Sequence, residues 1–297
     1  MVFRIHHRTA YRYAAPVSLS RQLLHLAPRE VVRQHCLEHE LHIEPAPSRR
    51  VDDSDVFGNP LTRLEFDRPH VELTITAQTR VRVTPRAEPV DAERSPAWED
   101  VVEQLAYRAG AAPTDTVLQA TRFRFESPYV RVKSVLADYA RASFAPRRPL
   151  LAAATALMNT INSEFTYDPK ATQIATPLLE VFASRRGVCQ DFAHLMLACL
   201  RSLGLSARYV SGYLRTSHAA GRARLVGADA SHAWVSLYCP LTGWVDFDPT
   251  NRVIADSAHV TVAWGRDFGD VSPLRGVILG GGAHELDVAV SVVPETP

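Results

Sequence analysis

The sequence contains few cysteines and carries no excess charge of either sign. Four of its 297 residues are cysteines, and no two of them form a CxxC pair, so neither a disulfide framework nor a cysteine-based zinc site is expected. Lys and Arg number 33 while Asp and Glu number 32, which gives no one-sided field to attract a polyanion or an anionic lipid surface. We therefore expect neither nucleic acid nor a membrane among the partners of this protein.

Long apolar segments are also missing. The longest apolar run extends from Leu150 to Met158, with Thr155 inside it, and is about half of the roughly 20 residues that a membrane-spanning helix needs. The first residues mix charged and apolar side chains and lack the apolar segment of roughly 7 to 15 residues that marks a signal peptide. We expect a cytoplasmic protein in a reducing environment, which leaves its thiols free to do chemistry.

The pattern of apolar residues changes along the chain, whose length fits about two domains of roughly 150 residues each. Residues 1–88 alternate with period two, as in the segment 70–77, where every second residue is apolar. This alternation predicts an N-terminal antiparallel β domain. Residues 89–148 contain three prolines in their first part, and we predict a partly helical connector with helices at 98–108 and 129–143.

Helical spacing followed by alternation predicts an α+β core over residues 149–270. Pro149 and Gly204 mark the start of one helix and the end of another. The final segment, 271–297, holds strands that can return to the β domain. The expected core helices are 150–165 and 191–203, and the expected strands are 207–214, 232–239, 244–248, 260–264 and 286–293.

The segment from Arg185 to Leu195 is the most informative for chemistry. Cys189 falls in the first turn of the expected helix, where unpaired backbone N–H groups favour a thiolate and are able to bind an oxyanion. We expect Gly187 to allow the sharp turn that leads into the helix. Asp191 in the same turn opposes part of the positive field, so the thiol also needs a base.

A histidine and two carboxylates follow on neighbouring strands. His232 opens the strand 232–239, and Asp246 and Asp248 lie on the strand 244–248. A three-residue hairpin loop at 240–242 would put Asp248 diagonally beside His232 and within side-chain reach, whereas Asp246 would face Ser236, four positions farther along. Asp248 is therefore the stronger candidate. Cys189, His232 and Asp248 then supply a nucleophile, a base and the group that orients the base.

These three ordered motifs resemble those of bacterial transglutaminase-like proteins, which have a papain-like thiol core. The resemblance covers Gly187 to Asp191, Ser231 to Val235, and Gly243 to Asn251. Outside the core, the segments His7 to Tyr13 and Gly265 to Val271 are similar to the β domain and the C-terminal region that accompany such cores. The resemblance implies a Cys189, His232 and Asp248 triad that works without a metal or an organic cofactor.

The reaction implied is acyl transfer through a thioester on a peptide or protein substrate. We expect hydrolysis ahead of transamidation, because water is always available as the acceptor. Tyr167, Gln190 and Trp234 are candidates for substrate binding or oxyanion contact, with ordinary packing as the alternative for Tyr167. Two other readings stay open: a non-catalytic peptide-binding module on the same fold, and a peptide-modifying subunit that needs a partner protein.

Other residues that suggest chemistry have simpler interpretations. His194 is about 500° around the helix from Cys189, so the two side chains do not share a face. Cys199 and Cys239 are expected to be buried packing residues. The histidines at 35, 39 and 42 are interpreted as strand residues rather than metal ligands, and the glycines at 280–282 as a turn rather than a phosphate loop.

Overall fold

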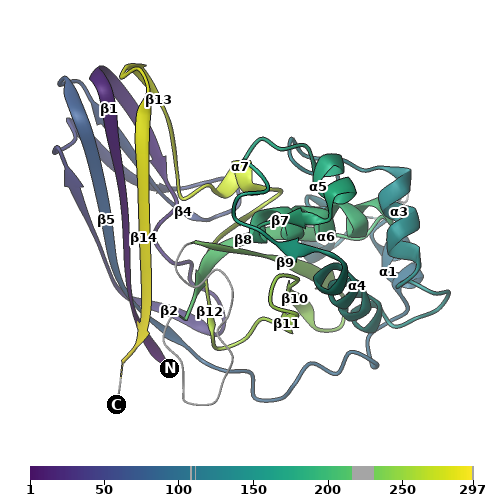
Figure 1. Ribbon diagram of the computed structural model, residues 1–297. Helices are drawn as coiled ribbons and strands as arrows, with labels where there is room; N and C mark the ends of the chain where they lie inside the picture. Colours follow the sequence, from purple (N-terminus) through teal and green to yellow (C-terminus); the bar gives the residue numbers. More distant parts are fainter. Residues whose placement is uncertain (108, 111, 216–230, 296–297) are drawn as a thin grey trace.

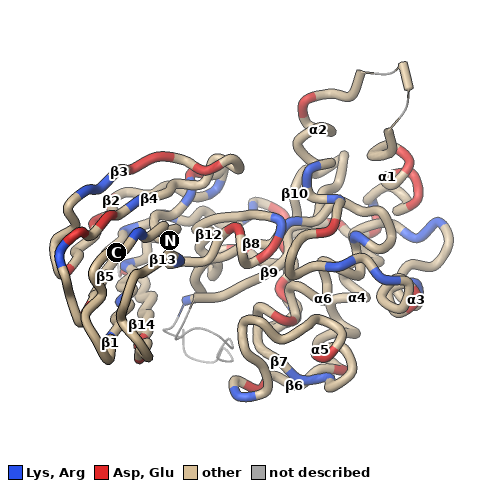
Figure 2. Tube along the Cα trace, turned by 90° about the horizontal axis from the view of Figure 1, so that it is seen from above, with Lys and Arg blue, Asp and Glu red and all other residues tan. Residues whose placement is uncertain are grey.

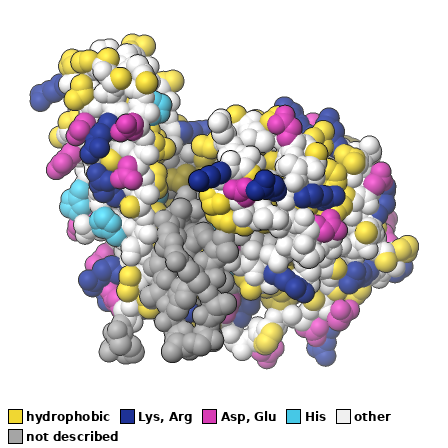
Figure 3. Space-filling model, in the orientation of Figure 1, with side chains coloured by type: hydrophobic (Ala, Val, Ile, Leu, Met, Phe, Trp, Pro, Cys, Tyr) yellow, Lys and Arg dark blue, Asp and Glu magenta, His cyan; other side chains and the backbone are white. Residues whose placement is uncertain are grey.

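The computed structural model describes residues 1–107, 109–110, 112–215 and 231–295. Figure 1 shows a curled β-sheet on one side and a mixed helix and strand core on the other. Charged side chains of both signs are interspersed on the face shown in Figure 3. No helix among the described residues is both long and apolar enough to cross a bilayer. The chain is thus an α+β protein, as the sequence predicts.

The curled sheet is built on β1, which runs from Val2 to Leu24. β1 pairs antiparallel with four other strands, among them the last two of the chain. Phe3, Ile5 and other alternate residues of β1 are buried, because successive side chains on a strand point to opposite faces. The other strands of the sheet are β2 (Gln34–Glu44), β3 (Arg49–Ser54), β4 (Pro60–Phe66), β5 (His70–Val83), β13 (Leu274–Gly280) and β14 (His284–Pro294).

The helices follow the predicted order, with differences at some boundaries. α4 and α6 match the expected core helices, whereas α3 begins five residues later than the 129–143 pattern indicates. Before α3, Ser127 and Val130 exchange backbone hydrogen bonds, and the Val132 N–H donates to the Glu126 carboxylate, so this segment forms a turn outside the helix. The helices are α1 (Trp98–Gln104), α2 (Asp115–Thr121), α3 (Ser134–Arg141), α4 (Leu150–Glu164), α5 (Leu178–Ser184), α6 (Cys189–Ser202) and α7 (Phe268–Val271).

A second, five-stranded antiparallel sheet lies in the core with the order β11-β10-β9-β8-β12. One of its faces packs on α6, where Tyr209 contacts His194. Neighbouring strand residues point to the opposite face, so Arg208 faces away from α6. The strands are β8 (Ala207–Leu214), β9 (His232–Cys239), β10 (Gly243–Asp248), β11 (Val253–Ile254) and β12 (His259–Gly265). A short parallel pair joins β6 (Thr166–Tyr167) to β7 (Arg186–Gly187).

The two parts share one hydrophobic core and polar bridges. Phe3 and Val292 of the large sheet belong to the same buried cluster as the α4 and α6 side chains. Gln34 accepts from the Thr261 backbone N–H and donates to its carbonyl, and Asn59 does the same with Trp264. Figure 2 shows β12 reaching toward the large sheet. The curled sheet therefore holds β12, an edge strand of the core sheet, in a fixed position.

Candidate active site

Cys189 is the first residue of α6, and its thiol is partly exposed. The residue before it, Val188, is extended, and its backbone N–H donates to the Asp191 carboxylate at 2.8 Å. The same carboxylate accepts from the Thr172 hydroxyl at 2.6 Å. Burial raises the pKa of Asp191, while these two donors partly offset that rise. Asp191 thus caps the backbone at the start of α6, while the Cys189 thiol stays partly exposed.

Gly187 has a steric role at this turn. Its backbone is outside the left-handed region, but a Cβ placed there would lie 2.7 Å from Asp191 Oδ2 and 2.8 Å from Asp191 Cβ. Both separations are shorter than real Cβ contacts. The sequence analysis expected Gly187 to allow the sharp turn into the helix, and the structure adds that the Asp191 side chain occupies the space a Cβ would need.

The hairpin that carries the histidine and the carboxylates has the predicted register. Gly243 faces Cys239 and Asp246 faces Ser236, with a three-residue loop between the strands. His232 Nε2 lies 2.9 Å from Asp248 Oδ2, and both side chains are fully buried. The structure therefore brings Asp248 rather than Asp246 to the imidazole.

Asp248 accepts hydrogen bonds from groups that the sequence analysis missed. Oδ1 accepts from the backbone N–H groups of Thr250 and Asn251, and Oδ2 also accepts from the Asn251 amide at 2.8 Å. His259 Nε2, at the start of β12, lies 3.1 Å from the same oxygen. Asn251 stands in the motif and was within reach of sequence reasoning. His259 comes from the far edge of the sheet, where no local pattern signals its approach.

The surroundings of His232 and Asp248 favour a protonated imidazole beside an ionised carboxylate. Burial alone lowers the pKa of His232, but the charges of Asp248 and Cys189 and the hydrogen bonds to them raise it to about 10. Burial likewise raises the pKa of the Asp248 carboxyl, yet His232 and His259 hold it well below its usual range. The Asp248 carboxylate accepts a hydrogen bond from His232 Nε2, so the imidazole keeps a proton on that nitrogen. Nδ1, which has no hydrogen-bond partner of good geometry among the described residues, is left for the thiol.

The ligand atoms of His232, Asp248 and His259 lie within 4.8 Å of one another, so a metal site must be considered. The two imidazoles contact the same carboxylate oxygen at hydrogen-bond distances, and three further N–H groups donate to this carboxylate. A cation at this point would compete with all of these donors. These donors are those of a hydrogen-bonded network that positions His232. They fit a metal centre less well.

The three other predicted site residues occupy different places. Tyr167 is held beside Gly187 by the β6 and β7 pair, and burial and the nearby Cys189 charge raise the pKa of its hydroxyl. Gln190 lines a cavity of about 410 Å³ at the start of α6. Trp234 is fully buried, and its ring packs edge-on against His259. Trp234 has no exposed surface and packs against the imidazoles of His232 and His259, and its contact with a substrate or an oxyanion stays a prediction.

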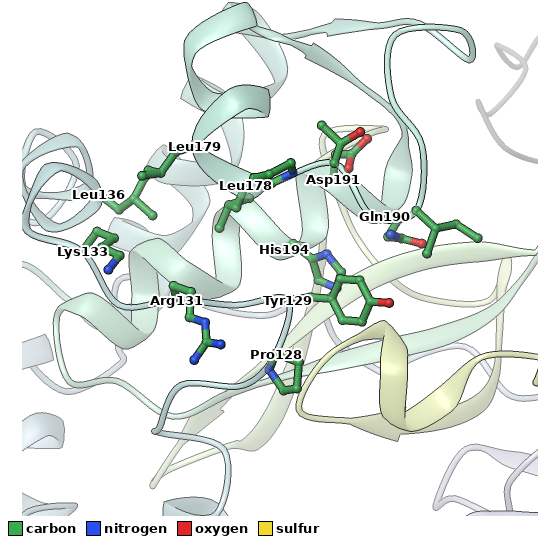
Figure 4. A pocket seen from close by; sticks show the side chains of 14 residues that line it. Pro128, Tyr129, Arg131, Lys133, Leu136, Leu178, Leu179, Gln190, Asp191 and His194 are labelled. Carbon is green, nitrogen blue, oxygen red and sulfur yellow. The ribbon is translucent and has the colours of Figure 1, made fainter.

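The cavity beside Gln190 lies at the first turn of α6, and its lining residues on this helix begin one residue after Cys189. Figure 4 shows Gln190, Asp191 and His194 on one side of it and Arg131 and Lys133 on another. A second cavity of about 540 Å³ shares Gln190 and Asp191 with the first. His194 itself is buried and accepts a hydrogen bond from the Phe268 backbone. The two cavities thus adjoin at the residues that follow Cys189.

The remaining thiols do not take part in this arrangement. Cys199 and Cys239 are buried, and Cys36 is partly exposed in the large sheet. Burial raises the pKa of Cys199. Cys189 is therefore the thiol that lies beside a histidine.

Comparisons with known proteins match both parts of the chain. Residues 3–82 match the bacterial transglutaminase-like N-terminal region, and residues 137–249 match the transglutaminase-like superfamily. An uncharacterized protein of Mycobacterium tuberculosis is 40% identical over 300 residues, which cover 98% of this chain and 92% of the relative. An uncharacterized protein of Mycobacterium leprae is 35% identical, with 97% of each chain covered.

Two further matches extend the comparison. A protein-glutamine gamma-glutamyltransferase of Pseudomonas aeruginosa is 31% identical over 168 residues, which cover 52% of this chain and 24% of that protein. A crystal structure of a "putative cysteine protease" from Cytophaga hutchinsonii superposes with a TM-score of 0.74 at 22% identity, covering 100% of this chain and 92% of the other. At that identity the superposition establishes a shared fold.

Proposed function

This chain belongs to the transglutaminase-like superfamily and carries the N-terminal region of its bacterial members, and on that premise we propose that it catalyses thiol-dependent acyl transfer on a peptide or amide substrate. Cys189 is the proposed nucleophile, His232 the base and Asp248 the group that orients the base. The observation that carries the proposal is the buried 2.9 Å contact between His232 Nε2 and Asp248, with His232 raised in pKa by Asp248 and Cys189.

The first half of the proposed reaction forms a thioester. The Cys189 thiolate attacks the acyl carbon, a C–S bond forms, and the carbonyl electron pair moves to oxygen. Backbone N–H groups in the first turn of α6 and the Tyr167 hydroxyl are the proposed partners of this oxyanion. When the C–N bond breaks, the leaving amine takes the proton from His232 Nδ1. Asp248 stabilises the imidazolium throughout.

The second half releases the acyl group. The acceptor gives a proton to His232 Nδ1 as it attacks the thioester, and the C–S bond breaks to restore the thiolate. Water as acceptor gives hydrolysis, and a primary amine gives transamidation. We favour hydrolysis because water reaches the partly exposed thiol without a dedicated site. The match to the gamma-glutamyltransferase over 168 residues supports transamidation as the second candidate.

Peptide substrates suit the cavities next to the thiol. The two cavities that adjoin at Gln190 and Asp191 provide a surface longer than a single side chain. Arg131 and Lys133 stand at one edge, and apolar side chains such as Leu136 and Leu178 line the interior. An extended chain would therefore find both apolar and charged contacts beside the first turn of α6.

The first test measures thiol reactivity without a substrate. Iodoacetamide labelling of the folded protein from about pH 4 to about pH 9 should modify Cys189 even where an isolated thiol is almost fully protonated. Cys36 is also partly exposed and serves as the internal control, with each site identified by mass spectrometry. In His232→Ala, Cys189 should no longer be labelled faster than Cys36. Equal labelling of the two thiols in the unaltered protein would favour a non-catalytic binding module.

The second test separates the two acceptors. A blocked glutamine-containing peptide is incubated with the protein, with and without a fluorescent primary amine. Hydrolysis predicts a carboxylate product in both mixtures, whereas transamidation predicts an amine adduct in the second. Cys189→Ala should form neither product. If reactive Cys189 gives no product with a panel of peptides, addition of cell extract tests the requirement for a partner protein.

A further inference from the structure

A third cavity lies on the face of the core sheet that is turned away from α6. Its volume is about 540 Å³, and it lies between the core sheet and the 30–34 and 83–86 segments of the N-terminal part. The residues that matter for its chemistry come from β8, β10, β12 and one connecting segment: Arg86, Arg208, Trp244, Asp246, His259 and Trp264. The cavity adjoins the proposed acyl-transfer site through His259, whose Nε2 is bonded to Asp248, and the proposed reaction uses none of its other lining residues.

Arg208 is a buried charge that lacks a polar partner. Its side chain belongs to a residue that is 9% exposed, and its guanidinium lies flat between two indoles, 4.1 Å from Trp244 and 3.6 Å from Trp264. Nε has no hydrogen-bond partner, and no ion pair reaches the guanidinium among the described residues. The indoles contact only the faces of the cation. The N–H groups along its edge still require an acceptor.

Two more unsatisfied nitrogens belong to the lining of the same cavity. His259 is 6% exposed, and its Nδ1 has no partner among the described residues, although Nε2 is bonded to Asp248. Arg86 Nε is likewise buried without a partner. Buried polar groups are seldom left unpaired in native proteins. The two guanidinium nitrogens are donors without an acceptor at one cavity, whereas His259 Nδ1 is an acceptor, because its ring donates from Nε2 to Asp248.

The acidic residues of the lining limit the charge of that acceptor. Asp256 is paired with Arg33 at 2.5 Å and with the Arg86 backbone. Asp246 and Arg208 both face Ser236 in the strand register, from opposite sides. Two strand spacings of about 4.8 Å therefore separate their backbones. The nearby carboxylates would repel a doubly charged ligand such as phosphate more strongly than a singly charged one.

We propose that this cavity binds a carboxylate, held by Arg208 and Arg86, with a small apolar body packed against Val83 and Ala255. A planar carboxylate has two oxygens and four acceptor positions, which match donors arriving from several directions. The source of the carboxylate is a free small molecule or a peptide, and both present the same group. This binding goes beyond the proposed acyl transfer and does not depend on it.

The test titrates the Cys189→Ala protein with sodium butyrate at constant ionic strength. This background keeps the cavity intact while removing any turnover, so failure of the acyl-transfer proposal leaves the result readable. Trp244 and Trp264 line the cavity, and their fluorescence reports binding. Butyrate should give a saturable change, whereas butyramide, its neutral counterpart, and chloride should not. Equal responses to all three would overturn the proposal.

Variants assign the binding to the named side chains. Arg208→Met and Arg86→Gln should each weaken butyrate binding about tenfold or more, as expected for loss of a charge-assisted hydrogen bond. Arg49→Gln, an exposed residue of the large sheet, is the matched control and should bind normally. Arg86 is only half-buried, so its variant decides the question if Arg208→Met does not fold. Unchanged binding in Arg86→Gln would contradict the assignment.

A last comparison distinguishes the two sources. A short apolar tripeptide with a free C-terminal carboxylate is titrated beside its C-terminally amidated form. Binding of the free peptide at least about tenfold more tightly than butyrate, with loss on amidation, would assign the cavity to peptide carboxylates. Similar affinities for butyrate and the free peptide would assign it to small molecules. Binding of the amidated peptide as tightly as the free one would overturn the role of the carboxylate.

Discussion

Asp248 and Arg208 are both buried charges on the same five-stranded sheet, and the protein treats them in opposite ways. Asp248 accepts hydrogen bonds from two imidazoles, one amide and two backbone N–H groups. Arg208 lies between two indoles and has no polar partner among the described residues. A charge satisfied from within fixes the position of its neighbours. A charge left unsatisfied indicates where an external group can bind.

The largest expected effect comes from removing the charge of Asp248. Asp248→Asn should lower kcat/KM by about a thousandfold or more, because the amide neither fixes the His232 tautomer nor stabilises the imidazolium. Asp246→Asn is the matched control, since Asp246 faces Ser236, and should change kcat/KM by about threefold at most. Steady-state kinetics on a peptide that gives product in the acceptor test provide the measurement. Equal losses in the two variants would remove the distinction between the carboxylates.

The contrast between the two charges extends to stability. Asp248→Leu should lower the free energy of unfolding by about 3 to 5 kcal/mol, because it leaves buried donors unpaired. Arg208→Met removes a desolvated charge but keeps an apolar chain between the indoles, so we expect a change within about 1 kcal/mol. Urea unfolding monitored by circular dichroism measures both. A large loss in Arg208→Met would mean that the guanidinium already has internal partners.

The pH dependence of stability tests the pairing of His232 with Asp248. The folded-state pKa of His232 is raised to about 10 from 6.5, so the folded state binds this proton more tightly than the unfolded state does. The stabilisation is fully present below about pH 6.5 and is lost as the pH rises toward about 10. The stability difference between the unaltered protein and His232→Gln should therefore shrink over that interval.

That comparison avoids interference from two other histidines. Burial lowers the pKa of His7 to about 4 and that of His194 to about 3, so their effects on stability appear only below about pH 6.5. Chemical unfolding at several pH values in the alkaline interval is sufficient. A difference that stays constant up to about pH 10 would mean that Asp248 does not hold a proton on His232.

The smallest expected effect concerns His259, which touches both regions. His259→Gln should lower kcat/KM about tenfold, the loss expected for one hydrogen bond to a charged acceptor. The pH profile of kcat should also shift, because Asp248 loses one of its donors, and this shift distinguishes positioning from mere packing. An unchanged pH profile would leave His259 as a packing residue beside Trp234.

Local patterns were sufficient to predict the candidate triad. The start of α6 at Cys189 follows from a helical stripe, and the His232 to Asp248 approach follows from the length of one hairpin loop. Both features depend on residues that are close in sequence. The turn at Gly187 was expected, but its steric role was not, because the space it leaves is filled by Asp191, a contact that backbone preferences do not encode.

The other side of the sheet could not be predicted in the same way. His259 and Trp264 reach their positions because β12 pairs with β8 rather than with its neighbour in sequence. Such pairing is decided by the whole packed core, and period-two patterns identify strands without naming their partners. The same holds for the segment before α3, where the Tyr129 N–H donates to the distant Asp267 carboxylate.

The pairing of β1 with β14 also has a consequence for how the chain folds. Phe3 lies opposite Pro294 in this ladder, and β5 covers the other edge of the same stretch of β1. During synthesis, β1 can pair with β5 early, but its second edge stays open until residues 284–294 have left the ribosome. An open strand edge readily pairs with another chain. Assembly of the large sheet is therefore a late event, because it depends on contacts between residues that are far apart in sequence. A nascent chain that stops before β14 exposes an unpaired edge of β1.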